Sequence, residues 1–220
     1  MKKGSFFMKD NTSNMISLLG KMRKQMNGAV ADSMFYYGQD YGLNYGVSLP
    51  TIRSIAKELD KDHEFALYLL RQQVRELKLA AMHIAKPEMI SIEEVQTWAN
   101  AIINSEIAEE CAFALLSQSP MAMDIYKLWI ASENEYVIYA ALMTAARNTS
   151  LTTDIIAPIN DIVNRYPDSR PIAHGVVAVL ANAYSQASLQ ECVKTVIAQL
   201  NNSNAAQYIR EEMSWRIEFN

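Results

Sequence analysis

The feature that most constrains the fold of this chain is the absence of glycine from residues 47–174. Glycine is the usual residue for the tight turns with positive φ that connect β-strands. Apolar residues in the same stretch recur at helical spacing, and no long run alternates between apolar and polar residues. The sequence therefore predicts an all-α protein.

Capping signals and apolar stripes indicate where the helices begin. Ser48 precedes one apolar stripe, and the pairs Ser91–Glu94 and Ser188–Glu191 have the spacing of capping boxes. Further helices are expected to begin near residues 73, 91, 106, 120, 135, 153, 170, 188 and 204. Taken in pairs they recur every 30–35 residues or so, which favours HEAT-like helical hairpins stacked into a curved solenoid. An irregular α-bundle is the structural alternative.

The length and composition are those of an ordinary soluble domain. The chain has 220 residues, half of them hydrophobic and 20% charged, so we expect a single domain over residues 1–220. No apolar run is long enough to cross a bilayer, and the segment MKKGSFFMKD has too short an apolar stretch for a secretory signal. Cys111 and Cys192 lie in apolar helical patterns and indicate neither disulfides nor a metal site. We therefore expect a cytoplasmic protein without a membrane or metal partner.

Charge is distributed unevenly along the chain. Residues 1–86 carry 13 Lys and Arg against 8 Asp and Glu, whereas residues 87–220 carry 7 against 16. If nucleic acid is the partner, the first part attracts it and the second part repels it. The alternative is that both parts are simply solvated charged faces.

A segment rich in glycine and tyrosine interrupts the helical pattern. Residues 28–46, GAVADSMFYYGQDYGLNYG, hold four of the seven glycines and the tyrosines Tyr36, Tyr37, Tyr41 and Tyr45. One interpretation is an aromatic platform for nucleic acid. The preferred one is a packed, turn-rich connector over residues 28–50.

Three stretches of the sequence together suggest a known family. The first is YGVSLPTIRSIAKELDKDHEFALYLLRQQVRELKLAAMHIA at residues 45–85. The second is SENEYVIYAALMTA at residues 132–145, and the third is YIREEMSWRIEF at residues 208–219. These stretches resemble the DNA alkylation repair family of bacterial HEAT-like-repeat glycosylases. Compared with the family, residues around 150–200 are an extra stretch about one helical pair long.

The resemblance implies a C-shaped stack whose concave face holds duplex DNA and releases cationic N3- or N7-alkylated purines, without metal or organic cofactor. Such a site uses a carboxylate and aromatic rings, which stabilise positive charge. Ser105 stands where the family has a tryptophan and Glu109 where it has an aspartate. The position of a phosphate-binding arginine falls on Ile138 or Tyr139, and Trp215 retains the tryptophan of the closing helix.

The leading hypothesis is a protein that binds duplex DNA and has weak or altered N-glycosylase activity. Glu109 and Trp215 are the candidate catalytic residues and are expected to flank the damaged nucleotide. The candidate phosphate contacts are Arg53, Lys57, Arg75 and Lys78. A second hypothesis is a non-catalytic helical scaffold that binds a protein partner, and a third is recognition of branched or distorted DNA without chemistry.

Overall fold

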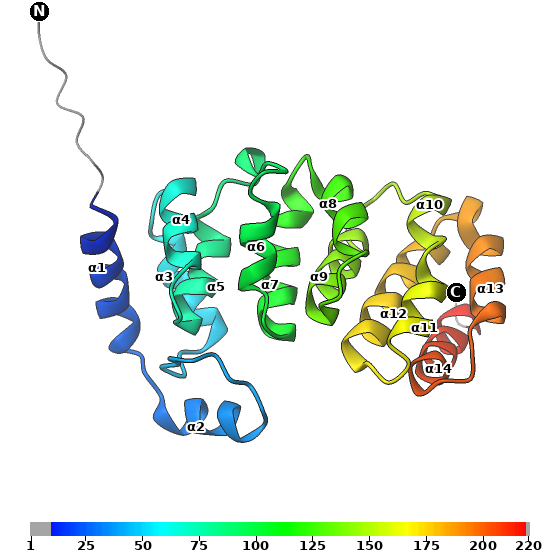
Figure 1. The fold of residues 1–220 in the computed structure, drawn as a ribbon, viewed down its shortest axis with the longest axis horizontal. Helices are drawn as coiled ribbons and strands as arrows, with labels where there is room; N and C mark the ends of the chain where they lie inside the picture. Colours follow the sequence, from blue (N-terminus) through cyan, green and yellow to red (C-terminus); the bar gives the residue numbers. More distant parts are fainter. Residues whose placement is uncertain (1–9, 219–220) are drawn as a thin grey trace, which may run out of the picture. The chain divides into compact units, whose positions relative to one another are not determined.

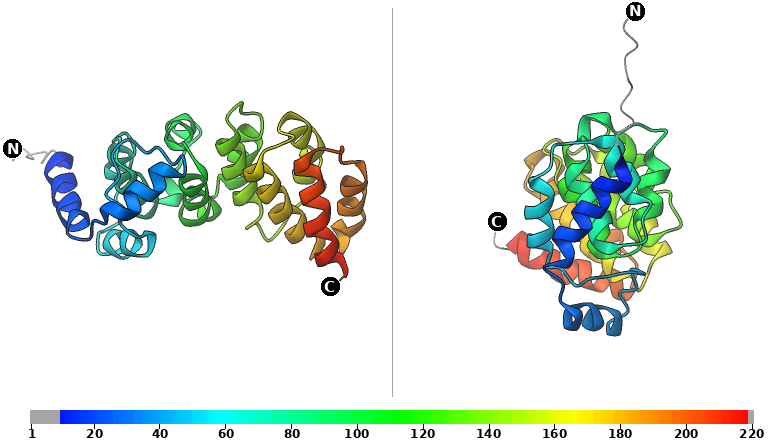
Figure 2. Two further views of the ribbon diagram at one scale, coloured as in Figure 1. Left: turned by 90° about the horizontal axis from the view of Figure 1, so that it is seen from below. Right: turned by 90° about the vertical axis from the view of Figure 1, so that its left-hand side faces the viewer.

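The computed structural model describes residues 10–218, which form helices joined by short loops (Figures 1 and 2). Within these residues no β-strand is present, and an isolated bridge joins Leu43 to Val74. The all-α prediction is therefore confirmed. The chain divides into two compact units, Met1–Ala85 and Lys86–Asn220. The expectation of one domain over residues 1–220 stays a prediction.

The described part of the first unit consists of helices whose core is the buried helix α5. Its helices are α1 (Asn11–Arg23), α2 (Gly28–Tyr36), α3 (Leu49–Lys57), α4 (His63–Leu70) and α5 (Arg75–Ile84). Helix α5 packs against both α3 and α4, and α1 adds its buried Leu18 and Met22 to the same core. As predicted, Ser48 caps α3, because its hydroxyl oxygen accepts the Thr51 N–H at 3.3 Å.

A buried ion pair at the start of α5 holds the end of the Gly/Tyr-rich segment. The Arg75 guanidinium donates to the Val47 carbonyl at 2.8 Å and to Glu76 Oε1 at 3.2 Å. The same Glu76 oxygen accepts the N–H groups of Tyr45 and Val47, at 3.1 and 3.2 Å. Since Arg75 and Glu76 are at most 1% exposed, these bonds offset part of the cost of burying their charges.

The Gly/Tyr-rich segment is packed at one end and exposed at the other. Gly46 has φ of +68°, and a Cβ there would lie 2.0 Å from the Asn27 carbonyl oxygen, so only glycine fits. Tyr41 is 3% exposed, whereas Tyr36 is 83% exposed. Helix α2 contributes no buried residue. The segment is thus a connector near Gly46 and an exposed helix near Tyr36.

The second unit is a stack of helical hairpins. Its helices are α6 (Val95–Ala101), α7 (Ser105–Ala114), α8 (Ala122–Trp129), α9 (Glu135–Ala145), α10 (Thr153–Ile156), α11 (Ile159–Arg165), α12 (Arg170–Tyr184), α13 (Gln190–Gln199) and α14 (Asn204–Glu218), with 3₁₀ turns at Pro87–Met89, Leu116–Gln118 and Ala187–Leu189. One row of this stack runs α7, α9, α12, α14, each packed against the next (Figure 1). The residues around 150–200, expected to be an extra helical pair, form the four helices α10 to α13. That this stretch is extra relative to the family stays a prediction.

Polar caps fix where the helices of this row begin. Asn104, Asn134 and Ser169 accept backbone N–H groups at the starts of α7, α9 and α12. The predicted capping boxes at Ser91 and Ser188 are wrong. The Ser91 side chain is hydrogen-bonded with Glu93 in a turn before α6, and Ser188 lies within a 3₁₀ turn before α13.

Gly175 allows an unusually close contact between α9 and α12. A Cβ at Gly175 would lie 2.8 Å from Leu142 Cβ and 3.1 Å from Tyr139 Cδ2. Real Cβ atoms do not approach other atoms as closely as 2.8 Å, so a side chain here would force the two helices apart. The close packing of α9 against α12 therefore requires glycine at residue 175.

We predict that Gly175→Ala destabilises the protein by about 1–3 kcal/mol through overpacking. Gly20→Ala is the matched control, because no atom lies within 4 Å of a Cβ at Gly20 in α1. That substitution should be neutral or stabilising by up to ~1 kcal/mol, since alanine favours helix. Urea unfolding followed by circular dichroism measures both. A Gly175→Ala protein as stable as Gly20→Ala would contradict the packing argument.

Candidate functional site

The packing of α7 against α9 brings two of the predicted site residues into direct contact. The Tyr139 hydroxyl on α9 donates to Glu109 Oε1 on α7 at 2.6 Å. Tyr139 is 3% exposed, while Glu109 lies on the exposed surface of α7. A short hydrogen bond to a charged acceptor is among the stronger ones in proteins, so it fixes the orientation of this carboxylate.

The environment of Tyr139 keeps its hydroxyl a hydrogen-bond donor. Burial raises the pKa of the Tyr139 phenol above its usual range, and the hydrogen bond to Glu109 and the charge of that carboxylate raise it further. The positive charge of Arg147 acts in the opposite direction and is the weakest of these influences. The Tyr139 hydroxyl therefore remains protonated near neutral pH and continues to donate its hydrogen bond to the Glu109 carboxylate.

Two residues that sequence reasoning missed complete this surface. Phe113 follows Glu109 by four residues on α7, so both side chains lie on one face of the helix, and Phe113 is 50% exposed. The Arg147 guanidinium, just after α9, lies 5.4 Å from the centre of the Phe113 ring. Its NH1 also donates to the Met143 carbonyl at 2.7 Å. The i, i+4 spacing of Glu109 and Phe113 was visible in the sequence, but the contact with Arg147 was not.

We call Glu109, Phe113, Tyr139 and Arg147 the α7–α9 cluster. It combines a carboxylate and an aromatic ring, both of which attract a cationic group such as an alkylated base. It also places a guanidinium beside them, and arginine is the side chain that binds phosphate most specifically. The family's phosphate-binding arginine falls on Ile138 or Tyr139, which carry no positive charge. Arg147 supplies a positive charge close to Tyr139.

Trp215 lies far from this cluster. It is on α14, where it is 61% exposed, and α9 and α12 stand between α14 and α7 in the row. Packed helices are about 8–10 Å apart, so three such steps separate the two helices. That Trp215 and Glu109 flank one nucleotide stays a prediction. Ser105 is the first residue of α7, one turn before Glu109, and is half-buried.

The four candidate phosphate contacts fall into two classes. On α3, Arg53 is half-buried and Lys57 is exposed. On α5, Arg75 is 1% exposed and Lys78 is 3% exposed. The predictions for Arg75 and Lys78 are wrong, because α5 is enclosed on almost every side and Arg75 is engaged by Val47 and Glu76. Burial also lowers the pKa of the Lys78 amine.

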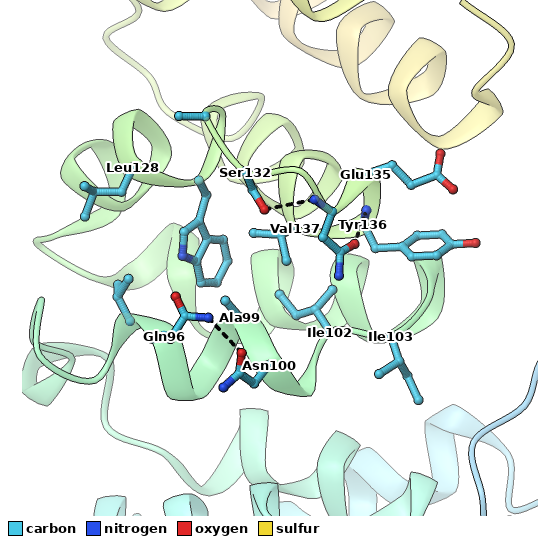
Figure 3. A pocket seen from close by; sticks show the side chains of 14 residues that line it. Gln96, Ala99, Asn100, Ile102, Ile103, Leu128, Ser132, Glu135, Tyr136 and Val137 are labelled. Atoms are coloured by element: carbon cyan, nitrogen blue, oxygen red, sulfur yellow. Dashed lines mark hydrogen bonds between the residues drawn. The ribbon is translucent and has the colours of Figure 1, made fainter. Parts of the chain in front are cut away.

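A large hollow in the second unit shares no lining residue with the cluster (Figure 3). It has a volume of about 970 Å³ and is formed by the ends of α6 and α8 and the start of α9. Apolar side chains such as Ile102 and Val137 line it together with amides, including Gln96 and Asn100, which are hydrogen-bonded at 2.7 Å. Among its described lining residues there is no lysine, arginine or histidine. This hollow is therefore poorly suited to hold phosphate.

Residues 10–218 offer neither a metal site nor a membrane-spanning helix. In this described part, no group of three or more His, Cys, Asp or Glu side chains is arranged to hold a metal ion. The same residues include no helix whose length and apolarity would let it traverse a bilayer.

Comparison with known proteins points to one family. The model of the family described as "DNA alkylation repair enzyme" matches residues 18–170. No curated protein matches. One similar solved structure has a TM-score of 0.68 and 18% sequence identity, covering 91% of this chain and 94% of its own. It is described as "A new family of proteins related to the HEAT-like repeat DNA glycosylases with affinity for branched DNA structures". This similarity confirms the predicted HEAT-like fold.

We predict that Arg75→Ala destabilises the first unit by about 3–5 kcal/mol, because it leaves the Glu76 carboxylate buried without its cation. Lys57→Ala is the control on an exposed lysine and should change stability by no more than about 0.5 kcal/mol. Thermal and urea unfolding measure both variants. An Arg75→Ala protein with wild-type stability would show that Arg75 is not structural and would restore it as a phosphate contact.

Proposed function

The chain belongs to the DNA alkylation repair enzyme family, and from this premise we propose that it binds DNA and has at most weak or altered N-glycosylase activity on cationic alkylated purines. The observation that carries the proposal is the α7–α9 cluster, with its carboxylate, ring and guanidinium on two packed helices. The proposed setting is the cytoplasm, and no metal or organic cofactor is required.

The first unit is the proposed source of DNA affinity. Residues 1–85 have an excess of four positive charges, from 12 Lys and Arg against 8 Asp and Glu. Lysine and arginine near phosphate release bound counterions, which drives binding at low salt. Arg53 and Lys57 remain the candidate contacts on this unit. The solved structure with affinity for branched DNA supports duplex or branched DNA as the ligand, and the α7–α9 cluster is the proposed place of the lesion.

The chemistry proposed for Glu109 is hydrolysis of the N-glycosidic bond. Alkylation leaves a positive charge on the purine, so the departing base takes the bonding electron pair and becomes neutral. Positive charge then develops on the sugar, where a carboxylate stabilises it. Water adds to the sugar carbon and releases a proton. Glu109 is the group that stabilises this charge, and Tyr139 holds its carboxylate in place.

Three features argue that such activity is weak. Glutamate in place of aspartate moves the carboxylate by about one methylene, and misplacement on the order of 1 Å can cost ~100-fold in rate. Ser105 offers no ring where the family has tryptophan, a loss of roughly 0.5–2 kcal/mol of attraction to a cation, and the Phe113 ring lies about two helical turns further along α7. Trp215 is on α14, with α9 and α12 between that helix and α7 in the row.

We predict that the protein releases 7-methylguanine from duplex DNA slowly and that Glu109→Gln lowers the rate at least about tenfold, because it removes the negative charge. Tyr139→Phe should lower the rate less, since the carboxylate remains but loses its donor. Glu133→Gln, at an exposed glutamate in the loop before α9, is the control. Chromatography of the released base measures the rate. Equal rates in the wild type and Glu109→Gln would remove Glu109 from the mechanism, and no release by any variant would leave binding alone.

A salt titration of binding to unmodified duplex DNA separates this proposal from the scaffold hypothesis. We expect the affinity to fall steeply as salt rises, and Lys57→Ala to reduce the slope of log K against log salt by about 1. Lys127→Ala, an exposed lysine in the acidic second unit, should leave the slope unchanged. Absence of binding even at low ionic strength would favour a scaffold that binds a protein partner.

The scaffold hypothesis has one observation of its own. The hollow of Figure 3 is lined by apolar side chains and amides in a unit with an excess of acidic residues. Such a lining suits a polypeptide better than a nucleic acid, because amides can pair with a peptide backbone and phosphate would be repelled.

A further inference from the structure

The C-terminal end of α2 carries the most exposed aromatic side chains among residues 10–85. Phe35 is 69% exposed, Tyr36 83% and Tyr37 76%. We call these three residues the aromatic knuckle. Scattered exposed apolar residues are normal on a protein surface, but three consecutive exposed rings are a concentrated patch that indicates a binding surface.

The knuckle is held by an ordered structure. At its start, α2 is fixed by the bond from the Asn27 N–H to the Tyr45 carbonyl at 2.8 Å. Near its end, the Asn44 amide donates to Met34 Sδ at 3.3 Å. The chain then turns at Gly38, which has φ of +80° and donates to the Phe35 carbonyl at 2.9 Å. The rings are therefore presented in place before any partner arrives, which lowers the entropic cost of binding.

The arrangement of the rings leaves aromatic surface available. Tyr36 and Tyr37 meet edge to face, with ring centres 5.3 Å apart and planes 83° apart. In such a pair one ring directs its edge at the other, so its own two faces stay uncovered by its neighbour. An uncovered aromatic face is the surface on which a nucleobase stacks, and every base has a π-face that can do so.

Basic residues come before α2 in the sequence. Helix α1 ends with Lys21 and Arg23, and Lys24 follows before α2 begins. The Arg23 guanidinium lies 5.7 Å from the centre of the Tyr45 ring, in the segment that fixes the start of α2. Arg23 and Lys24 thus precede the start of α2, and the rings lie at its other end. Surfaces that bind unpaired nucleic acid use cations to contact phosphates and rings to contact bases.

We propose that the aromatic knuckle stacks on unpaired bases at the branch point of branched DNA, while Arg23 and Lys24 contact the neighbouring phosphates. Bases inside a duplex are already stacked on one another and offer no free face, so the knuckle gives a preference for branched over plain duplex DNA. The inference rests on the proposed DNA binding and assigns it a specificity surface that lies in the first unit, apart from the α7–α9 cluster.

The test compares binding to a three-way junction with binding to a plain duplex of equal length, with 2-aminopurine at the branch point of the junction. The full chain is measured as wild type and as the triple variant Phe35→Ala, Tyr36→Ala and Tyr37→Ala. We expect the triple variant to lose about tenfold or more in junction affinity, with duplex affinity unchanged. Stacking in the wild type should quench the 2-aminopurine fluorescence, and the variant should restore it.

Two further variants separate ring stacking from other causes. A triple leucine variant at the same positions keeps an apolar surface without aromatic faces, and it should bind the junction as poorly as the alanine variant. Met89→Ala with Leu128→Ala removes two exposed apolar side chains of the second unit, 48% and 49% exposed, and should have no effect. Circular dichroism checks that each variant is folded.

The outcomes distinguish this inference from the function on which it rests. If the wild type binds neither duplex nor junction at low salt, the proposed DNA binding fails and the inference with it. If the wild type binds DNA but the alanine variant keeps the junction preference, the inference alone is overturned. Wild-type junction affinity in the leucine variant would also overturn it, because the patch would then be an apolar contact surface, such as one for a protein.

Discussion

The candidate site depends on the packing around one side chain, Tyr139. Its ring lies against α12, where the absence of a side chain at Gly175 permits the close contact, and its hydroxyl reaches across to Glu109 on α7. One buried tyrosine thus links three helices of the row. Because the ring cannot shift without opening the contact at Gly175, the direction of the hydroxyl, and hence of the Glu109 carboxylate, is set by the fold itself.

The first unit likewise depends on one interaction, the buried ion pair of Arg75 and Glu76, which stabilises the fold and is not available to a ligand. The sequence predicted Arg75 as a phosphate contact. In the structure Arg75 and Glu76 bind the backbone of Tyr45 and Val47, which lie about 30 residues earlier in the chain. A buried ion pair is stabilised by added hydrogen bonds, and here the segment from Tyr45 to Val47 supplies them to Arg75 and to Glu76 Oε1.

The sequence predicted local features well and tertiary ones poorly. Helix starts near residues 135, 153, 170 and 204 agree with the structure, because caps such as Asn134 and Ser169 act on their own helix. The capping box at Ser91 failed because a turn with the same residues competes with the helix start. Glu109 and Tyr139 could be proposed singly, but their contact required the packing of α7 on α9. Arg147 was missed because its partner, Phe113, is 34 residues away.

The position of Arg147 follows from the burial of Tyr139. At residue 139 the side chain is 3% exposed and packed against α12, so a guanidinium there would be removed from water and costly unless fully paired. A phenol fits, since it has one donor and Glu109 accepts it. Arg147, two residues after the last residue of α9, is exposed, and the helix dipole favours a cation near a C-terminus. Arg147 occupies that end, so the cluster keeps both charges while only a neutral group is buried between them.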